Sequence, residues 1–216
     1  MVNLSEYEKN ILAGNTGIPG DRMAMELVVE SAKILGATSL IPIVSSHVDG
    51  CLYHGDSGVL YCEKLAAKGT QVKIPTTTNV GALNLSKLSQ TKLSKEKRDM
   101  AYRLMKVHQE MGCVPTWTCA PYQAGARPSF GQQVAWGESN AVAFTNSILG
   151  ARTNRYGDFL DIACAISARA PYYGLHRSEN RTAKLMLDVS NLSNKLLQED
   201  AFFPVLGSMV GKLTGE

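Results

Sequence analysis

The stretch DRMAMELVVESAKILGATSLIPIV, residues 21–44, contains two kinds of hydrophobic pattern and decides the fold class. Apolar residues such as Met23 and Leu27 recur at helical spacing, and Asp21 is a possible helix cap. Gly36 can end this helix, and the TSLIPIV that follows is typical of a short strand. A helix followed by a single short strand is the repeating unit of α/β proteins.

The same alternation extends in both directions from this stretch. Upstream, Ser5 and Glu8 have capping-box spacing, which predicts a short helix that ends near Gly14. Downstream we expect helices at 57–69, 94–112 and 139–150, the last of them buried, and a strand at 71–75. The sequence therefore predicts an α/β fold with a mainly parallel sheet flanked by helices, and a single domain over 1–216.

Composition limits the function classes. The 216 residues are 44% hydrophobic and 19% charged, and the net charge of +3 is too diffuse to favour nucleic-acid binding. There is no leader-like amino terminus, and no apolar run reaches the roughly 18 residues of a membrane span. We expect a soluble, cytoplasmic protein whose five cysteines are reduced.

Polar residues concentrate in the segments that follow the predicted strands and helices. Six segments stand out: SHVDGCLYHGD (46–56), PTTTN (75–79), TCAPYQ (118–123), WGESN (136–140), GARTNR (150–155) and GLHRSEN (174–180). In parallel α/β folds the carboxyl ends of the strands converge on one crevice, where ligands bind. The sequence therefore predicts a site assembled from distant parts of the chain.

Several of these polar groups have a structural explanation as well as a functional one. His47 and Asp49 could form an acid/base or metal pair, or could simply be hydrogen-bonded scaffold. His176 with Arg177 and Arg181 could hold an anionic substrate, or could be exposed basic residues at a helix start. The sequence leaves both alternatives open.

The cysteines divide by their surroundings. Cys62 and Cys164 lie in apolar helical patterns and are expected to be buried, and Cys113 is expected at the start of a strand. Cys119 lies in a polar loop, where a thiolate could be a nucleophile or a ligand to zinc or iron. Because no CxxC pair is present, a compact zinc site is disfavoured.

Five longer motifs together resemble one family: SHVDGCLYHGDSG, VKIPTTTNVGAL, MGCVPTWTCAPYQ, AWGESNAVAFTNSILGARTNR and GLHRSENR. The chain is similar to the amino-terminal part of the large, catalytic subunit of the aconitase X family. This resemblance implies aconitase-like layers of parallel sheet and a hydro-lyase that removes water from a small hydroxy acid. It also implies an iron–sulfur cluster that acts as a Lewis acid, and a small swivelling subunit or domain as partner.

The resemblance assigns roles to individual residues. It makes Cys119 the cluster ligand that this chain supplies. It makes Glu138 and Ser139 the expected catalytic residues, and the residue pattern adds His47. By the same resemblance, the expected substrate-binding residues are Gly50, Cys51, Leu52, Thr78, Asn79 and Asn140, and the residue pattern adds Arg152 and His176.

The family divides by substrate, and the motifs favour one branch. GCLYHGD and PTTTNVGAL resemble the branch that dehydrates cis-3-hydroxy-L-proline, whereas the mevalonate 5-phosphate branch is expected to carry a serine in place of Leu52. Two further cluster cysteines are expected beyond Glu216, so the resemblance implies a chain truncated at its carboxyl end. A non-catalytic binding scaffold, and a thiol enzyme that uses Cys119 with His47 or His176, are the alternatives.

Overall fold

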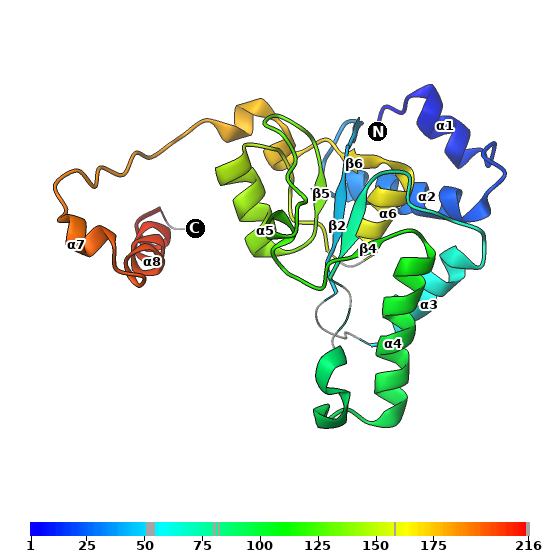
Figure 1. Cartoon of the computed structure of the whole chain (residues 1–216). Helices are drawn as coiled ribbons and strands as arrows, with labels where there is room; N and C mark the ends of the chain where they lie inside the picture. The colour runs from blue at the N-terminus through cyan, green and yellow to red at the C-terminus, as the bar shows by residue number, and fades with distance from the viewer. Residues whose placement is uncertain (51–54, 80, 82, 158, 215–216) are drawn as a thin grey trace. The chain divides into compact units, whose positions relative to one another are not determined.

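The structure is a computed structural model that describes the chain except for residues 51–54, 80, 82, 158 and 215–216. Two units can be distinguished, Met1–Arg181 and Thr182–Glu216. The first unit contains every strand among the described residues (Figure 1). Cys51 and Leu52, two of the expected substrate-binding residues, lie outside the described residues.

A four-stranded parallel sheet forms the centre of the first unit. Its order is β4 (Val114–Pro115), β3 (Thr76–Thr78), β2 (Ser46–Val48) and β5 (Ala135–Trp136). The other two strands, β1 (Leu40–Pro42) and β6 (Arg169–Pro171), pair antiparallel in a separate ribbon. The predicted α/β class with a mainly parallel sheet and flanking helices is confirmed.

The helices also largely agree with the sequence prediction. The first unit contains α1 (Glu6–Leu12), α2 (Pro19–Ile34), α3 (Asp56–Ala66), α4 (Lys95–Glu110), α5 (Ser139–Phe144) and α6 (Leu160–Ser167). A π-helical segment, η3 (Thr145–Leu149), continues α5. Short 3-10 turns lie at η1 (Leu85–Gln90), η2 (Pro121–Gln123), η4 (Gly174–His176) and η5 (Ser178–Arg181). The predicted Ser5–Glu8 capping box is present at the start of α1.

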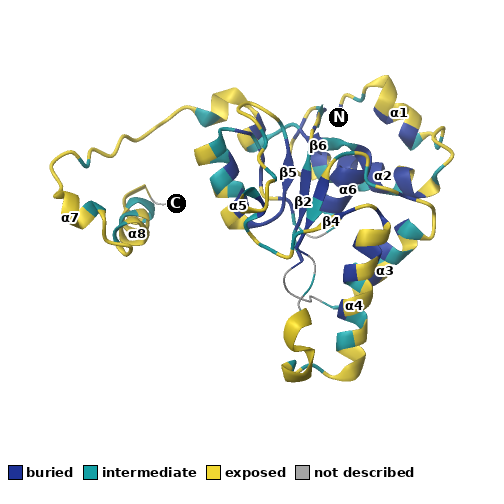
Figure 2. Cartoon of the chain, in the orientation of Figure 1, coloured by how far each residue is buried: buried dark blue, intermediate teal, exposed yellow. Residues whose placement is uncertain are grey.

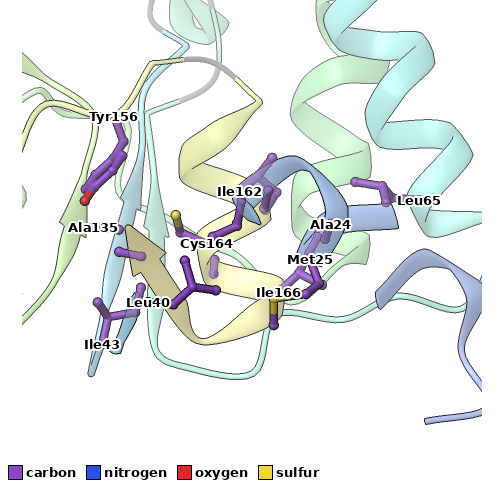
Figure 3. Packing of buried hydrophobic residues seen from close by; sticks show 14 of the residues in the cluster. Ala24, Met25, Leu40, Ile43, Leu65, Ala135, Tyr156, Ile162, Cys164 and Ile166 are labelled. Carbon is purple, nitrogen blue, oxygen red and sulfur yellow. The ribbon is translucent and has the colours of Figure 1, made fainter. Parts of the chain in front are cut away.

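The core lies on one side of the sheet, around α6. Every residue from Asp161 to Ser167 is buried, and α6 packs against α2 and β2 (Figures 2 and 3). Neighbouring strand residues point to opposite faces, so Ala135 joins this core whereas Trp136 packs with Ala141 of α5 on the other face. The sheet is therefore covered on both sides, as parallel sheets generally are.

Two strand positions differ from the prediction. The segment 71–75 is not a strand, and the strands are instead Ser46–Val48 and Thr76–Thr78, inside segments that we expected to be loops. These strands are polar but buried because hydrogen bonds satisfy their side chains: the Ser46 hydroxyl donates to the Ala135 carbonyl oxygen at 2.8 Å. A search for apolar runs cannot find such strands.

Two helix details also need correction. Asp21 is not the cap of α2, since the helix begins two residues earlier; its buried carboxylate instead pairs with Lys73 Nζ at 2.6 Å. The helix predicted at 139–150 is only partly buried, with Ile148 68% exposed. The glycine stop of this helix is confirmed, because Gly150 adopts a φ of 68°, which costs little without a Cβ.

The second unit contains α7 (Asn194–Leu197) and α8 (Phe202–Thr214). None of the described residues of α8 is buried, and its apolar side chains Phe203, Met209 and Leu213 are exposed. Among the described residues, no helix combines the length and the apolar character that crossing a membrane requires.

Candidate active site

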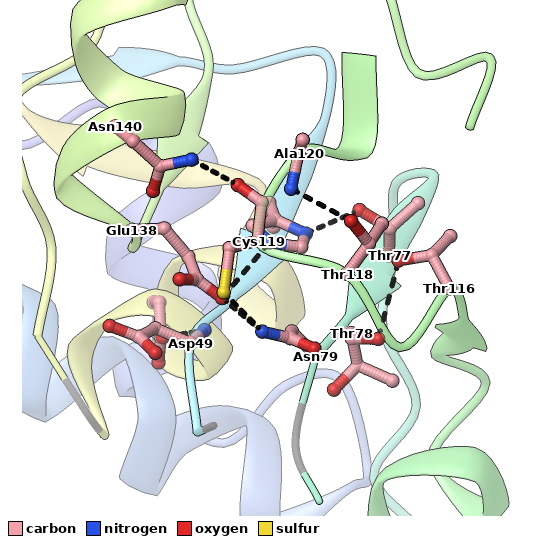
Figure 4. A network of polar contacts seen from close by, with 12 residues as sticks. Asp49, Thr77, Thr78, Asn79, Thr116, Thr118, Cys119, Ala120, Glu138 and Asn140 are labelled. Atoms are coloured by element: carbon pink, nitrogen blue, oxygen red, sulfur yellow. Dashed lines mark hydrogen bonds and ion pairs between the residues drawn. The ribbon is translucent and has the colours of Figure 1, made fainter. Parts of the chain in front are cut away.

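Functional side chains gather where the four parallel strands end. Asp49 follows β2, Asn79 follows β3, Cys119 follows β4 by four residues, and Glu138 follows β5 by two. Figure 4 shows these four residues close together, although they are spread over ninety positions of the chain (49–138). The predicted crevice at the carboxyl ends of the strands is the position where α/β proteins bind ligands.

Cys119 is held in a loop that is anchored to the neighbouring strand. The amide nitrogens of Thr116 and Trp117 both donate to the carbonyl oxygen of Thr78, at 3.0 and 3.3 Å. The Thr118 hydroxyl accepts from the amide of Ala120 at 3.1 Å, which closes a tight turn around the cysteine. This turn leaves the Cys119 side chain exposed.

Asn79 connects Cys119 to Glu138. Its Nδ2 donates to Glu138 Oε1 at 2.6 Å and to Cys119 Sγ at 3.0 Å (Figure 4). Asn79 is 8% exposed, so both bonds lie in a region largely shielded from water. The amide of Asn79 therefore helps to fix where the sulfur of Cys119 lies relative to Glu138.

Glu138 is an ionised carboxylate directed into the site. It occupies the N-cap position of α5, but its side chain makes no capping bond and is 5% exposed. Burial raises the pKa of Glu138, but the interactions with His47, Cys119 and Asn79 lower it by more. The net pKa therefore lies below its usual range. Glu138 is therefore a base that needs no further deprotonation at neutral pH.

His47 lies beneath Glu138 and has no exposed surface. Its Nε2 is 3.7 Å from Glu138 Oε1, its Nδ1 is 2.8 Å from the Thr77 hydroxyl, and its ring packs against Trp136. Because the ring is fully buried in this conformation, the geometry favours a role for His47 in positioning Glu138. The expected catalytic role of His47 stays a prediction.

The remaining expected residues at the strand ends differ in their exposure. Asn140 is exposed and donates from Nδ2 to the Cys119 carbonyl oxygen at 2.7 Å, which ties α5 to the cysteine loop. Ser139 is exposed at the first position of α5, beside Glu138. Thr78 and Gly50 are both buried, and their carbonyl oxygens accept backbone bonds, so they shape the site from below.

Two residues that the sequence prediction missed hold the base of the site together. Gly137 approaches so closely that an added Cβ would lie 2.6 Å from Asp49 Cβ. The buried Asp161 accepts from the Asp49 amide at 2.9 Å, and Asp49 also pairs with Arg155 at 3.4 Å. Gly137 was part of the WGESN segment but was given no role of its own, and Asp161 is hidden in an apolar helix.

Arg152 and His176 belong to a separate cluster. The His176 ring is fully buried between the Tyr156 hydroxyl, 2.5 Å from Nε2, and Gln133 Oε1, 2.6 Å from Nδ1. Burial, followed by the charges of Arg152 and Arg181, lowers the pKa of His176 to about 4. The alternative of an exposed His176 is therefore wrong. The expected substrate-binding role of His176 stays a prediction, although a buried neutral ring does not favour binding of an anion.

Arg152 supports the same cluster from outside. Its Nη1 donates to the His176 carbonyl oxygen at 3.2 Å and to the Ser178 hydroxyl at 2.8 Å. Arg152 therefore fixes the turns at 174–181 and is not directed at Cys119 by any contact among the described residues. Its expected contact with a substrate is unsupported by this geometry.

Comparison with known proteins identifies the family. The model of the "Aconitase X first domain" matches residues 1–179. The chain belongs to the aconitase X family. This match covers the whole sheet and all the strand-end residues described above.

Curated relatives of this aconitase X chain carry two kinds of name. The chain is 39% identical over 210 residues to a cis-3-hydroxy-L-proline dehydratase of Pseudomonas aeruginosa, covering 97% of this chain and 36% of the relative. It is 37% identical over 214 residues to a phosphomevalonate dehydratase large subunit of Thermococcus kodakarensis, covering 98% of this chain and 52% of the relative. The chain thus spans about a third to a half of the length of these relatives.

A solved structure supports the fold. The crystal structure of Thermococcus kodakaraensis aconitase X in its holo-form matches with a TM-score of 0.74 and 39% sequence identity. The match covers 84% of this chain and 45% of that chain. The aconitase X fold is therefore shown for most of the chain.

The donor set of this aconitase X chain fits a single cluster ligand. Cys119 is exposed and accepts a hydrogen bond, whereas Cys62 and Cys164 are buried as expected, and Cys113 is buried too. Burial raises the pKa of Cys113 to about 12 and that of Cys164 well above its usual range, so both thiols stay protonated. Among the described residues, no group of three His, Cys, Asp or Glu could hold a metal ion.

Proposed function

We propose that this chain is the part of a hydro-lyase that binds the substrate and one corner of an iron–sulfur cluster. The observation that carries the proposal is the pair of bonds from Asn79 Nδ2, to Cys119 Sγ and to Glu138 Oε1. These bonds place an exposed thiol next to an ionised carboxylate at the ligand-binding edge of the sheet. The dehydratase names of the relatives support the same reaction class.

Cys119 is the residue that would hold the cluster, which when bound supplies a Lewis acid for the leaving hydroxyl group. The remaining ligands would come from outside the described residues. Asn79 and Asn140 hold Cys119 through its sulfur and its carbonyl oxygen, and so fix where the thiolate points. A ligand held from two sides keeps its geometry without reorganising.

Glu138 is the proposed base. Removing water from a hydroxy acid takes a proton from the carbon next to the carboxylate and a hydroxide from the neighbouring carbon. Glu138 is ionised and would accept that proton, while Asn79 and His47 hold the carboxylate in place. Ser139, exposed beside Glu138, would contact the substrate on the first turn of α5.

The substrate that we propose is cis-3-hydroxy-L-proline. Two relatives with that name, from Pseudomonas aeruginosa and Hypocrea jecorina, are 39% and 38% identical to this chain. Mevalonate 5-phosphate is the second candidate, because phosphomevalonate dehydratase large subunits show up to 38% identity. The name "large subunit" supports a small swivelling subunit or domain as partner of this chain too.

The compartment that we propose is the cytoplasm. None of the four cysteines that the structure describes forms a disulfide, and three of them are buried. A reducing compartment keeps cysteines in this state.

The test is anaerobic purification of the complete enzyme, with iron, acid-labile sulfide and turnover of cis-3-hydroxy-L-proline assayed together. We expect Cys119→Ser to lose most of its iron and its turnover. The matched control is Cys113→Ala, which removes a buried, protonated thiol six positions away and should keep both. A Cys119→Ser enzyme with full iron and rate would refute the ligand assignment.

A further inference from the structure

A groove opens beside the candidate active site and shares Asn79 with it. It has a volume of about 450 Å³, and Trp117 and Met105 are among the residues that form its wall. Asn79 lines the groove while its Nδ2 bonds Cys119 and Glu138. A molecule that reacts at Glu138 therefore has room to extend into this groove.

Trp117 is held in this wall by an unusual backbone conformation. Its φ of 50° lies in the left-handed region, which is costly for any residue with a Cβ, and its amide donates to the Thr78 carbonyl oxygen. Its side chain is 39% exposed, so burial in the core does not explain the conformation. Strained residues of this kind cluster at ligand-binding sites.

The space beside the indole depends on a glycine. A Cβ added at Gly81 would lie 3.9 Å from both Trp117 Cε3 and Met105 Cε. Gly81 thus lies between the two apolar side chains, and a larger residue would fill the gap. Because position 81 is a glycine, the space beside the indole is left open for part of a ligand.

The lining residues that the structure describes carry no charge. Beyond Trp117 and Met105, the described lining is Leu83, Leu85, Asn84 and Ser86. Lys106 lines a second groove on the α4 side of Trp117, together with Tyr102, and this lysine is paired with Glu110. A phosphate group placed beside Asn79 would therefore lose its hydration without gaining a cationic partner from the groove wall.

We propose that Trp117 is a specificity-determining residue whose indole holds the ring of an unphosphorylated cyclic imino acid in this groove. The proposal rests on the proposed dehydratase function and deepens it by naming a residue that selects the substrate. A flat aromatic face stacks on a saturated ring and attracts its protonated nitrogen. The described lining of the groove offers no cation to a phosphate group, which favours the unphosphorylated substrate.

The test compares KM and kcat of Trp117→Leu, Trp117→Phe and the wild type in the complete enzyme. We expect Trp117→Leu to raise the KM for cis-3-hydroxy-L-proline about tenfold, because an aromatic contact of this kind is lost. The kcat should change little, since the contact is made equally in ground and transition states. The KM of Trp117→Phe should lie between those of the wild type and Trp117→Leu. Gly81→Val should also raise the KM, because the valine side chain fills the space beside the indole.

Tyr102→Leu is the matched control, because Tyr102 lines the second groove but not the one that contains Asn79. The proposal is overturned if Trp117→Leu leaves KM unchanged, or if Tyr102→Leu raises KM as much. It is also overturned if the wild type uses a phosphorylated hydroxy acid with a higher kcat/KM than the imino acid.

Failure of the proposed function has a different signature. A wild type that converts no hydroxy acid at all would refute the dehydratase, whereas the groove can still be tested by binding. The chain has two tryptophans, and the other one, Trp136, is buried. A fluorescence change on adding the imino acid that disappears in Trp117→Leu supports the groove, and no change in the wild type refutes it.

Discussion

Asn79 Nδ2 lies 2.6 Å from Glu138 Oε1, and this bond joins the carboxyl ends of β3 and β5 across the intervening strand β2. His47 lies on β2 below the bond and contacts Glu138 from underneath. Three adjacent strands thus fix the position of one carboxylate. Because the carboxylate is already held in place, the site needs little rearrangement when the reaction occurs.

Asn79→Ala should lower kcat about 10- to 100-fold, because it removes donors to both Glu138 and Cys119. The iron content should also fall, since the Cys119 sulfur loses the amide that holds it in position. Asn140→Ala is the matched control, because it removes an amide that bonds only the Cys119 backbone, and its loss should be smaller. Steady-state kinetics with iron assays check this, and equal losses in the two variants would contradict the linking role of Asn79.

His47→Gln should lower kcat about tenfold and leave KM nearly unchanged, because His47 positions Glu138 without touching the substrate. Thr77→Val, which removes the hydroxyl that orients His47, should have a similar but weaker effect. Steady-state kinetics separate the two parameters. A raised KM with an unchanged kcat would instead show that His47 contacts the substrate.

Gly137→Ala should destabilise the protein by about 1–3 kcal/mol, since its Cβ would lie 2.6 Å from Asp49 Cβ in a packed region. Gly58→Ala is the matched control: it lies inside α3, where a Cβ would meet only Leu104 at 3.9 Å. That change should be stabilising by about 0.5–1 kcal/mol. Thermal denaturation measures both, and an equal Tm in the two variants would contradict the close approach.

The free energy of unfolding should decrease as the pH is lowered from 6.5 to about 4, because His176 is buried as a neutral ring. Its pKa is lowered in the folded state, so across this range the unfolded chain binds a proton that the folded chain does not. The buried neutral His176 therefore contributes roughly 3 kcal/mol to the free energy of unfolding. This contribution is fully present at and above neutral pH. Denaturant unfolding at several pH values measures it, and His176→Gln should flatten the pH dependence; an unchanged slope would contradict the assignment.

Much of the fold could be predicted from the sequence because it depends on local patterns. The capping box at Ser5, the helix at 94–112 and the glycine stops at Gly36 and Gly150 each rest on residues close together in the chain. The polar strands could not be predicted in this way. Ser46 and Thr76–Thr78 are strands because tertiary hydrogen bonds and the pairing with β5 and β4 make their burial possible.

The sequence by itself determined the α/β class, the burial of Cys62 and Cys164, and the position of Cys119 in an exposed polar loop. Each of these follows from residue type and local periodicity. Only the tertiary structure decided which polar residues meet. It brought Asn79, Cys119 and Glu138 together, placed His176 in a separate buried cluster, and revealed the role of Gly137. The physical reason is that parallel strands bring residues distant in the chain to one edge, and this pairing is not encoded in any local pattern.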